Sequence, residues 1–170
     1  TTTSTLPPTS NPEKISIQIE ETAIDDGLPC TFKRQKNKAG RLLITGSRCD
    51  DNLSGNNGED VLRGGDGADQ INGRKGGDRL RGHQDDDTMR GGQGQDSMRG
   101  GRGDDDLFGN HGPDWINGKK DNDRLRGGTG PDTLRGSSGD DTLRGGSRSD
   151  NLIGGSCADA EHFVGELVCT

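Results

Sequence analysis

The chain has 170 residues and a formal net charge of −7, and only 23% of its residues are hydrophobic and 2% aromatic. These side chains cannot supply the apolar surface that an ordinary globule of this length buries, so a conventional compact core is excluded. No apolar run reaches the roughly 18 residues of a membrane-spanning helix. Glycine accounts for 31 residues. The chain is therefore either unfolded or a repeat structure stabilised by bound ligands.

The N-terminal third predicts an arm followed by strands. Residues 1–14 are rich in Thr, Ser and Pro, which indicates a flexible or extended arm. Ile15–Glu20 alternates apolar and polar residues, which predicts a strand with one buried face. Thr31–Lys36 and Arg41–Thr45 predict a hairpin across Asn37–Gly40. Residues 15–45 are thus expected to cap the first coil of a solenoid; in the alternative, Ile15–Ile19 docks on another subunit.

A nine-residue period begins after this cap and runs from Gly46 to Asp159. An aspartate recurs every nine residues and is followed two residues later by an apolar side chain and four residues later by glycine. The aspartates are Asp51, Asp60, Asp69, Asp78, Asp87, Asp96, Asp105, Asp114, Asp123, Asp132, Asp141, Asp150 and Asp159. The apolar residues are Leu53, Leu62, Ile71, Leu80, Met89, Met98, Leu107, Ile116, Leu125, Leu134, Leu143 and Leu152. Ile44 extends the frame backwards by one unit, and the pattern fails at Glu161.

Each repeat reads G-G-x-G-x-D-x-U-x, where U is a large apolar residue. In the segment Gly127–Asp132 the glycines permit the positive φ that a tight turn requires. Thr133, Leu134 and Arg135 predict a three-residue strand whose central side chain points inward. A thin core formed by one apolar residue per repeat follows from this pattern.

The C-terminal residues 160–170 are apolar again and are expected to cap the last coil. Four cysteines lie near the two ends of the chain: Cys30, Cys49, Cys157 and Cys169. An even number of cysteines so placed predicts disulfides and an oxidising compartment. Of the three pairings, we favour Cys30–Cys49 with Cys157–Cys169.

The repeat resembles the calcium-binding RTX, or haemolysin-type, nonapeptide repeat. The resemblance implies an all-β fold, a right-handed parallel β-roll of about six coils over residues 46–159, with two repeats in each coil. It also implies Ca²⁺ between loops one coil apart, so that Asp60 works with Asp78 and Asp114 with Asp132. Thirteen loops paired in this way allow at most eleven sites.

The expected ligands are the thirteen repeat aspartates and the backbone of the glycine-rich turns, since Ca²⁺ takes six to eight oxygens from carboxylates and carbonyls. Other turns depart from the pattern, with cations at Arg74–Lys75 and Lys119–Lys120 and aspartate for glycine at Asp85 and Asp121, so fewer than eleven tight sites are expected. Four turns carry the full motif: Gly64, Gly65 and Gly67; Gly91, Gly92 and Gly94; Gly100, Gly101 and Gly103; Gly127, Gly128 and Gly130.

Arginine recurs at the ninth repeat position. Arg63, Arg81 and Arg99 lie one coil apart and should stack at about 4.8 Å on one sheet. One interpretation is a solvated outer face, and the other is a site for polyanions such as acidic glycans. The complete set is Arg63, Arg81, Arg90, Arg99, Arg126, Arg135 and Arg144.

The remaining motifs are weak. The glycosylation sequon at Asn52 overlaps the core residue Leu53, and the repeat accounts for Arg102-Gly103-Asp104. The histidines fall at unrelated repeat positions, and no nucleophile–base pair can be assembled, so we expect neither zinc nor an enzyme. The leading prediction is an extracellular, secreted or cell-surface structural module that folds on Ca²⁺ and assembles end to end through its N-terminal strand. The alternatives are a soluble calcium- or polyanion-binding protein and the secretion module of a larger RTX protein.

Overall fold

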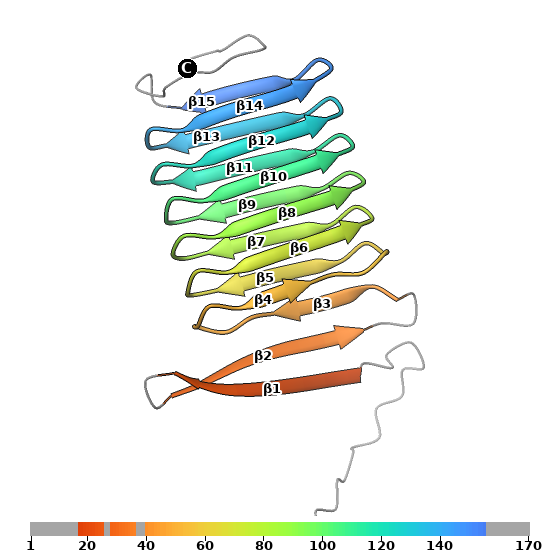
Figure 1. Ribbon diagram of the computed structural model, residues 1–170, viewed down its shortest axis with the longest axis vertical. Coiled ribbons are helices and arrows are strands. Elements are labelled where there is room, and N and C mark those ends of the chain that lie inside the picture. The colour runs from red at the N-terminus through yellow and green to blue at the C-terminus, as the bar shows by residue number, and fades with distance from the viewer. Residues whose placement is uncertain (1–16, 26–27, 37–39, 156–170) are drawn as a thin grey trace, which may run out of the picture.

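The computed structural model describes residues 17–25, 28–36 and 40–155, which contain fifteen strands. Figure 1 shows how these strands are arranged. No helix in the described residues is long and apolar enough to cross a membrane. The strands are β1 (Ile17–Asp25), β2 (Leu28–Lys36), β3 (Leu42–Thr45), β4 (Asn52–Ser54), β5 (Val61–Gly65), β6 (Gln70–Lys75), β7 (Arg79–His83), β8 (Thr88–Gln93), β9 (Ser97–Gly101), β10 (Asp106–His111), β11 (Trp115–Lys120), β12 (Arg124–Thr129), β13 (Thr133–Ser138), β14 (Thr142–Ser147) and β15 (Asn151–Gly155).

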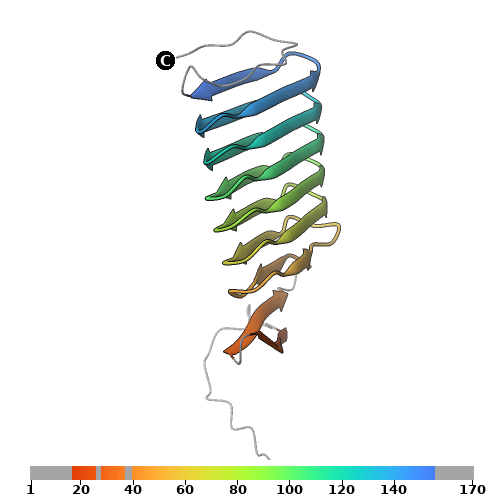
Figure 2. The ribbon, with the colours of Figure 1, turned by 60° about the vertical axis from the view of Figure 1, so that its left-hand side comes forward.

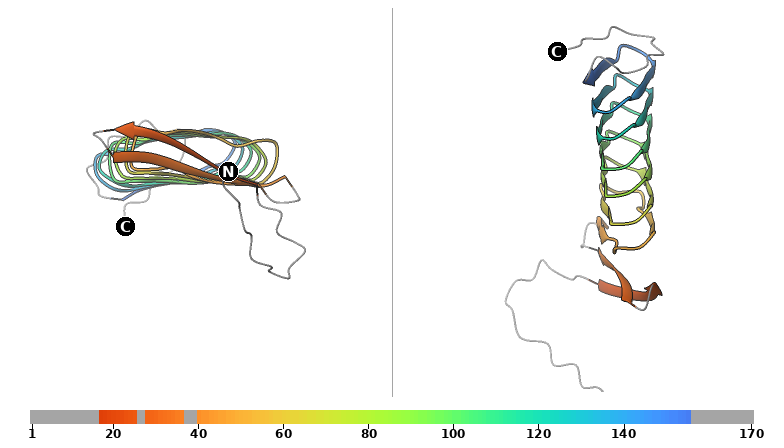
Figure 3. Two further views of the ribbon diagram at one scale, coloured as in Figure 1. Left: turned by 90° about the horizontal axis from the view of Figure 1, so that it is seen from below. Right: turned by 90° about the vertical axis from the view of Figure 1, so that its left-hand side faces the viewer.

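From β3 onward the chain is a parallel solenoid of about six coils, which confirms the predicted fold class. Odd-numbered strands form sheet A in the order β3-β5-β7-β9-β11-β13-β15, and even-numbered strands form sheet B from β4 to β14. The pairing register advances by eighteen residues, as in Leu62↔Leu80 and Ile71↔Met89. Two repeats therefore make one coil, and the two sheets face each other as a flattened tube (Figures 2 and 3).

The core is a file of single side chains between the two sheets. Each predicted inward residue is buried, with at most 4% of its surface exposed. The flanking residues alternate with it in burial, as in the exposed-buried-exposed start of β7 around Leu80, because successive side chains of a strand point to opposite faces. Leu42 and Ile44 of β3 extend this core by one strand at its N-terminal end.

The repeat strands are longer than the three residues predicted. β13 continues through Gly136 and Ser137 to Ser138. The reason is that parallel pairing persists into the glycine segment, as the Ser137↔Gly155 pair shows. The first residues of the predicted turns therefore belong to the strands.

The predicted N-terminal hairpin is confirmed. β2 pairs antiparallel with β3 through Lys36↔Leu42 and Lys33↔Thr45, and β1 pairs antiparallel with β2. β1 extends to Asp25, beyond the predicted end at Glu20, because its pairing continues to Asp25↔Leu28. Side-chain alternation carries no information about such backbone pairing. β1 and β2 add two strands to sheet A alone, so sheet A has nine strands and sheet B has six.

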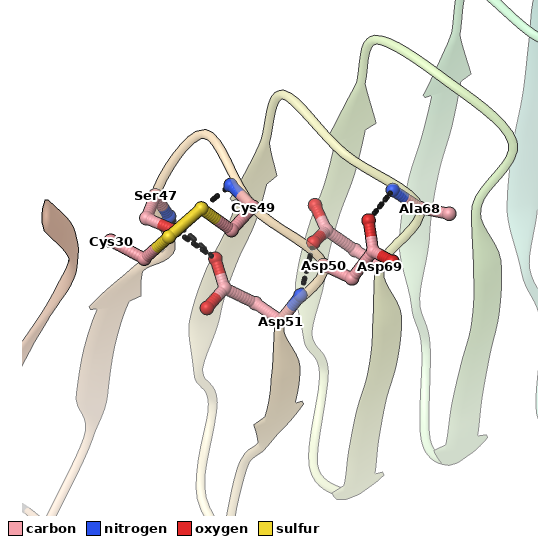
Figure 4. The surroundings of a disulfide bond; sticks show 7 residues. All are labelled: Cys30, Ser47, Cys49, Asp50, Asp51, Ala68 and Asp69. Atoms are coloured by element: carbon pink, nitrogen blue, oxygen red, sulfur yellow. Dashed lines mark hydrogen bonds between the residues drawn. A yellow bond between two sulfur atoms is a disulfide. The ribbon is translucent and has the colours of Figure 1, made fainter. Parts of the chain in front are cut away.

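A disulfide joins the hairpin to the first turn of the solenoid, as predicted. Cys30 of β2 is bonded to Cys49, nineteen residues later, with 5.8 Å between the two Cα atoms (Figure 4). The predicted Cys157–Cys169 bond, the arm 1–14 and the cap 160–170 lie outside the described residues.

Candidate metal centre

The turns between the sheets form two rows along the two edges of the solenoid (Figure 1). We call the six-residue turns that lead from sheet A to sheet B the first loop row, and those that lead back the second loop row. The first row ends in Asp51, Asp69, Asp87, Asp105, Asp123 and Asp141, and the second in Asp60, Asp78, Asp96, Asp114, Asp132 and Asp150. Asp159 lies outside the described residues.

Within each row the aspartates are stacked one coil apart, as the sequence predicted. The backbone N–H of Asp60 donates to Asp78 Oδ1 at 2.7 Å, and that of Asp114 donates to Asp132 Oδ1 at 2.9 Å. The same bond recurs along both rows. It joins Asp51 to Asp69 at the start of the first row and Asp132 to Asp150 at the end of the second. One carboxylate oxygen of each aspartate thus satisfies the backbone of the coil before it.

The second carboxylate oxygen has no hydrogen-bond partner in ten of these aspartates. The ten buried Oδ2 atoms belong to Asp69, Asp78, Asp87, Asp96, Asp105, Asp114, Asp123, Asp132, Asp141 and Asp150. A buried carboxylate oxygen without a partner carries a desolvation cost that the protein itself does not repay. Each is therefore a buried polar atom that a cation could satisfy.

The first glycine of each turn makes room for this oxygen. A Cβ added at Gly109 would lie 2.7 Å from the carbonyl oxygen of Gly127 and closer still to Asp114 Oδ2. Gly127 stands in the same relation to Gly145 and Asp132. A carboxylate oxygen of one coil and a glycine carbonyl of the next therefore lie beside the same glycine Cα, which no other residue could replace without displacing them.

Burial also changes the acidity of these carboxylates. Desolvation raises the pKa of Asp105 and of Asp123 from 3.8 to about 8, against the lowering effect of one backbone hydrogen bond. It raises the pKa of Asp78 and of Asp114 to about 7, and that of Asp132 to about 6. Neighbouring carboxylates add to each of these shifts by repulsion. Without a cation, several of these buried sites hold a proton near neutral pH.

The turns that depart from the glycine pattern keep the same backbone. In the full turn Gly127–Asp132 the positive φ angles are at Gly128 and Gly130. Arg74, His83 and Lys119 occupy the former position with φ of 79°, 106° and 101°. These side chains accept a conformation that costs most residues free energy. The coil therefore imposes the turn geometry on sequences that lack the glycines.

The first two turns are different. Asp51 Oδ2 accepts a hydrogen bond from the backbone N–H of Ser47 at 2.6 Å and lies 3.0 Å from the Ser47 hydroxyl (Figure 4). Asp60 Oδ2 accepts from the Asn56 N–H, also at 2.6 Å. Neither Ser47 nor Asn56 has a positive φ. These two aspartates, both expected as ligands, already have partners for the oxygen that stays free in the ten others.

The first loop row carries a second, outer set of hydrogen bonds that the sequence reasoning missed. The residue just before the repeat aspartate accepts a bond from the equivalent N–H of the next coil, the reverse of the inner direction. The pairs are Ala68 N to Asp50 Oδ1 (Figure 4), Asp104 N to Asp86 Oδ1, Asn122 N to Asp104 Oδ1 and Asp140 N to Asn122 Oδ1, each 2.8 Å long. Its signal is an eighteen-residue recurrence of Asp or Asn at 50, 86, 104, 122 and 140.

The oxygen atoms of the inner aspartates and of the glycine carbonyls are ligands of the kind that Ca²⁺ prefers. This hard cation takes six to eight oxygens from carboxylates and backbone carbonyls, and both kinds of oxygen meet beside first glycines such as Gly109 and Gly127. No group of three or more His, Cys, Asp or Glu side chains converges anywhere in the described part of the chain. An ion here would consequently be held by at most two such side chains, such as Asp114 and Asp132 of consecutive coils, together with main-chain carbonyls.

Fold and site together define a class of protein: a parallel β-solenoid whose stacked turns present rows of buried carboxylates to cations. The chain belongs to the RTX calcium-binding nonapeptide repeat family. The model of this family, which spans four copies of the repeat, matches residues 45–80, 75–107, 99–134, 117–152 and 135–160. This match confirms the resemblance seen in the sequence. No curated protein matches the chain.

Proposed function

We propose that the chain is an extracellular module that remains unfolded until Ca²⁺ binds and then forms the β-solenoid. The observation that carries the proposal is the set of ten buried Oδ2 atoms without a hydrogen-bond partner. A core of one apolar side chain per nine residues does not offset roughly 1–2 kcal/mol of backbone entropy per residue. Ion binding supplies the difference, as in other proteins whose folding is coupled to a metal.

Ca²⁺ titration followed by circular dichroism tests this proposal. The chain dialysed free of calcium should lack the β signal, and Ca²⁺ should restore it cooperatively, whereas Mg²⁺ should not, because it demands six short octahedral contacts. Ion counting on the folded protein should give up to ten ions. Folding in calcium-free buffer, with the Cys30–Cys49 bond reduced so that it cannot hold the coil, would overturn the proposal.

The extracellular location is supported by the disulfide. Such bonds persist in oxidising compartments, and Cys30–Cys49 ties the hairpin to the first coil. Calcium in millimolar amounts outside cells and scarce inside would then make folding a consequence of export. Mass spectrometry of the native secreted protein should find both cysteines oxidised.

Self-association is a second candidate function. β1 is the end strand of sheet A and pairs with β2 on one side only among the described strands. An open strand edge invites strand addition from another chain, and a contact of this kind need not close, so it would produce a filament. Analytical ultracentrifugation in saturating calcium tests it: a monomer at high concentration means that the hairpin is only a cap.

We propose that the module itself is not an enzyme. Of the described histidines, His111 meets Thr129 Oγ1 at 2.8 Å, and burial together with Arg81 and Arg63 lowers the pKa of His83. The Thr129 hydroxyl donates to the Asn110 carbonyl oxygen at 3.3 Å, so its proton is not directed at His111, and His83 has arginines as neighbours. Assay of the calcium-loaded chain against ester, peptide and glycoside substrates should give no turnover.

A further inference from the structure

The outer face of sheet A carries arginines that form no ion pair with the described residues. The outward positions of β5, β7, β9, β11 and β13 hold Val61, Arg63, Arg79, Arg81, Ser97, Arg99, Trp115, Asn117, Thr133 and Arg135. We call this set the arginine face. Its five arginines form no ion pair with any described residue, whereas Arg124 of sheet B pairs with Asp106.

Three of these arginines are stacked directly on one another. The register pairs Arg63 with Arg81 and Arg81 with Arg99, on adjacent strands. Like charges directly opposite each other in a sheet destabilise it. The arrangement therefore costs folding free energy that an anionic ligand along the row would recover.

Trp115 gives this face an aromatic platform. Arg99 stacks on the Trp115 ring, with 5.3 Å from its guanidinium carbon to the ring centroid. Arg79, Ser97 and Trp115 are paired in sequence across three coils, and the small serine leaves a hollow of about 510 Å³ between the two larger side chains. Glu59, Asp78, Gln95 and Asp96 also line this hollow. An indole can stack on a sugar ring, amide and carboxylate oxygens can accept hydrogen bonds from its hydroxyls, and the guanidinium groups of Arg79 and Arg99 can hold its acidic substituent.

We infer that the arginine face binds a linear acidic polysaccharide that carries sulfate or carboxylate groups. From Arg63 to Arg135 the face spans four strand spacings of about 4.8 Å, or roughly 19 Å, and its two outward positions per strand lie about 7 Å apart. It is thus long and one polymer chain wide. Each guanidinium can hold a sulfate or carboxylate through two parallel hydrogen bonds.

Other polyanions fit this face less well. Duplex DNA, whose major groove alone is about 12 Å wide, would place phosphates over the acidic turns at the edge of the sheet. Single-stranded nucleic acid uses an aromatic platform for each of several successive bases, and Trp115 is the one aromatic residue of the arginine face. The inference rests on the proposed function in one respect, because the row exists only in the folded coil.

Trp115 is the single tryptophan of the chain, so its fluorescence reports on this face alone. In saturating calcium, titration with a heparin octasaccharide or a hyaluronan octasaccharide should change this fluorescence saturably, and the two glycans separate sulfate from carboxylate recognition. The variant Arg63→Gln/Arg81→Gln/Arg99→Gln should bind at least tenfold more weakly. The matched variant Arg90→Gln/Arg126→Gln/Arg144→Gln, which loses the same charge from sheet B, should bind within threefold of the original.

Four outcomes would overturn the inference: no response to either glycan, equal weakening by the two variants, or a response only to a twenty-base polythymidine or only to phosphatidylserine vesicles. Circular dichroism of the same samples shows whether each variant folds, and the pair Arg81→Gln and Arg144→Gln replaces the triple variants if they do not. Binding by a chain that folds without calcium would refute the proposed function and leave this inference standing.

Discussion

The two loop rows share one inner architecture and differ in what surrounds it. Both stack buried aspartates through the same N–H to Oδ1 bond. Outside this shared ladder, the first row adds Asp50, Asp86, Asp104 and Asp140 in the position before the repeat aspartate. The second row has Pro113 and Pro131 at that position, which carry no N–H and cannot form the outer bonds. The coil thus requires the inner aspartate and leaves the outer positions free to vary.

The added carboxylates make the first row more dependent on cations. Asp86 and Asp87 repel Asp105, and Asp104, Asp121 and Asp141 repel Asp123, while only Asp150 is a repelling neighbour of Asp132. These charges, together with deeper burial, raise the pKa values of the first row to about 7 or about 8, whereas those of the second row reach about 6 or about 7. We therefore expect the first row to bind calcium more tightly and to fail first when calcium is removed.

The largest expected effect comes from replacing a single inner aspartate by alanine, either Asp105 in the first row or Asp114 in the second. Asp105 and Asp114 belong to consecutive turns in the middle of the solenoid, and each is at most 3% exposed. Each alanine variant should lose ligands for two ions. At calcium 100-fold above its Kd each ion contributes about 2.7 kcal/mol, so two contribute about 5 kcal/mol, which is roughly 10–20 °C in melting temperature for a chain of this size.

The difference between Asp105→Ala and Asp114→Ala tests the comparison of the rows. In saturating calcium Asp105→Ala should lower the melting temperature more, because its ions also offset the charges of the outer carboxylates. Thermal melts followed by circular dichroism in saturating calcium measure this, and equal shifts for the two variants would show that the outer carboxylates do not affect the inner sites.

A smaller effect is expected from pH in the absence of calcium. Because Asp105 has a pKa of about 8 when folded and 3.8 as the reference value, the folded state holds more protons between these values. The free energy of unfolding should therefore fall as pH rises from 4 to 8, and acidification from pH 8 to 5 should increase the β signal of the calcium-free chain.

The rows should differ in the pH range of this response. Asp132, with a pKa of about 6, should contribute below pH 6, and Asp105 should contribute up to pH 8. Asp105→Asn should thus flatten the curve between pH 6 and 8, whereas Asp132→Asn should leave that range unchanged. A β signal that rises with pH in calcium-free buffer would mean that the buried carboxylates are not destabilising in the folded chain.

Much of the fold was predictable because the repeat aspartate recurs thirteen times in the sequence. The nine-residue period placed every core residue from Leu53 to Leu152. The pairing of Asp60 with Asp78 and the stacking of Arg63, Arg81 and Arg99 also needed the resemblance to the RTX repeat, which implies that two repeats make one coil.

The parts that were missed depend on something other than this period. Strand ends are set by backbone pairing, which extends β13 through its glycine. Ser47 and Asn56, in the first described turn of each row, bond to Asp51 and Asp60, an arrangement that the later turns do not share. The outer ladder has a period of eighteen residues, so a repeat averaged over nine residues obscures it. Features that alternate between the rows are invisible to a pattern that treats all repeats as equal.

The smallest expected effect is that of the outer ladder itself. Asp104 accepts a 2.8 Å bond from the Asn122 N–H, and its own N–H donates to Asp86. Asp104→Ala should lower the free energy of unfolding in saturating calcium by about 0.5–1.5 kcal/mol, the usual value of one such bond. Gln95→Ala, at the equivalent position in the second row, should stay within about 0.5 kcal/mol of the original. Urea unfolding of both variants in calcium measures the difference. If Asp104→Ala were as mild as Gln95→Ala, neither the charge nor the hydrogen bond of the Asp104 carboxylate would stabilise the first row in saturating calcium.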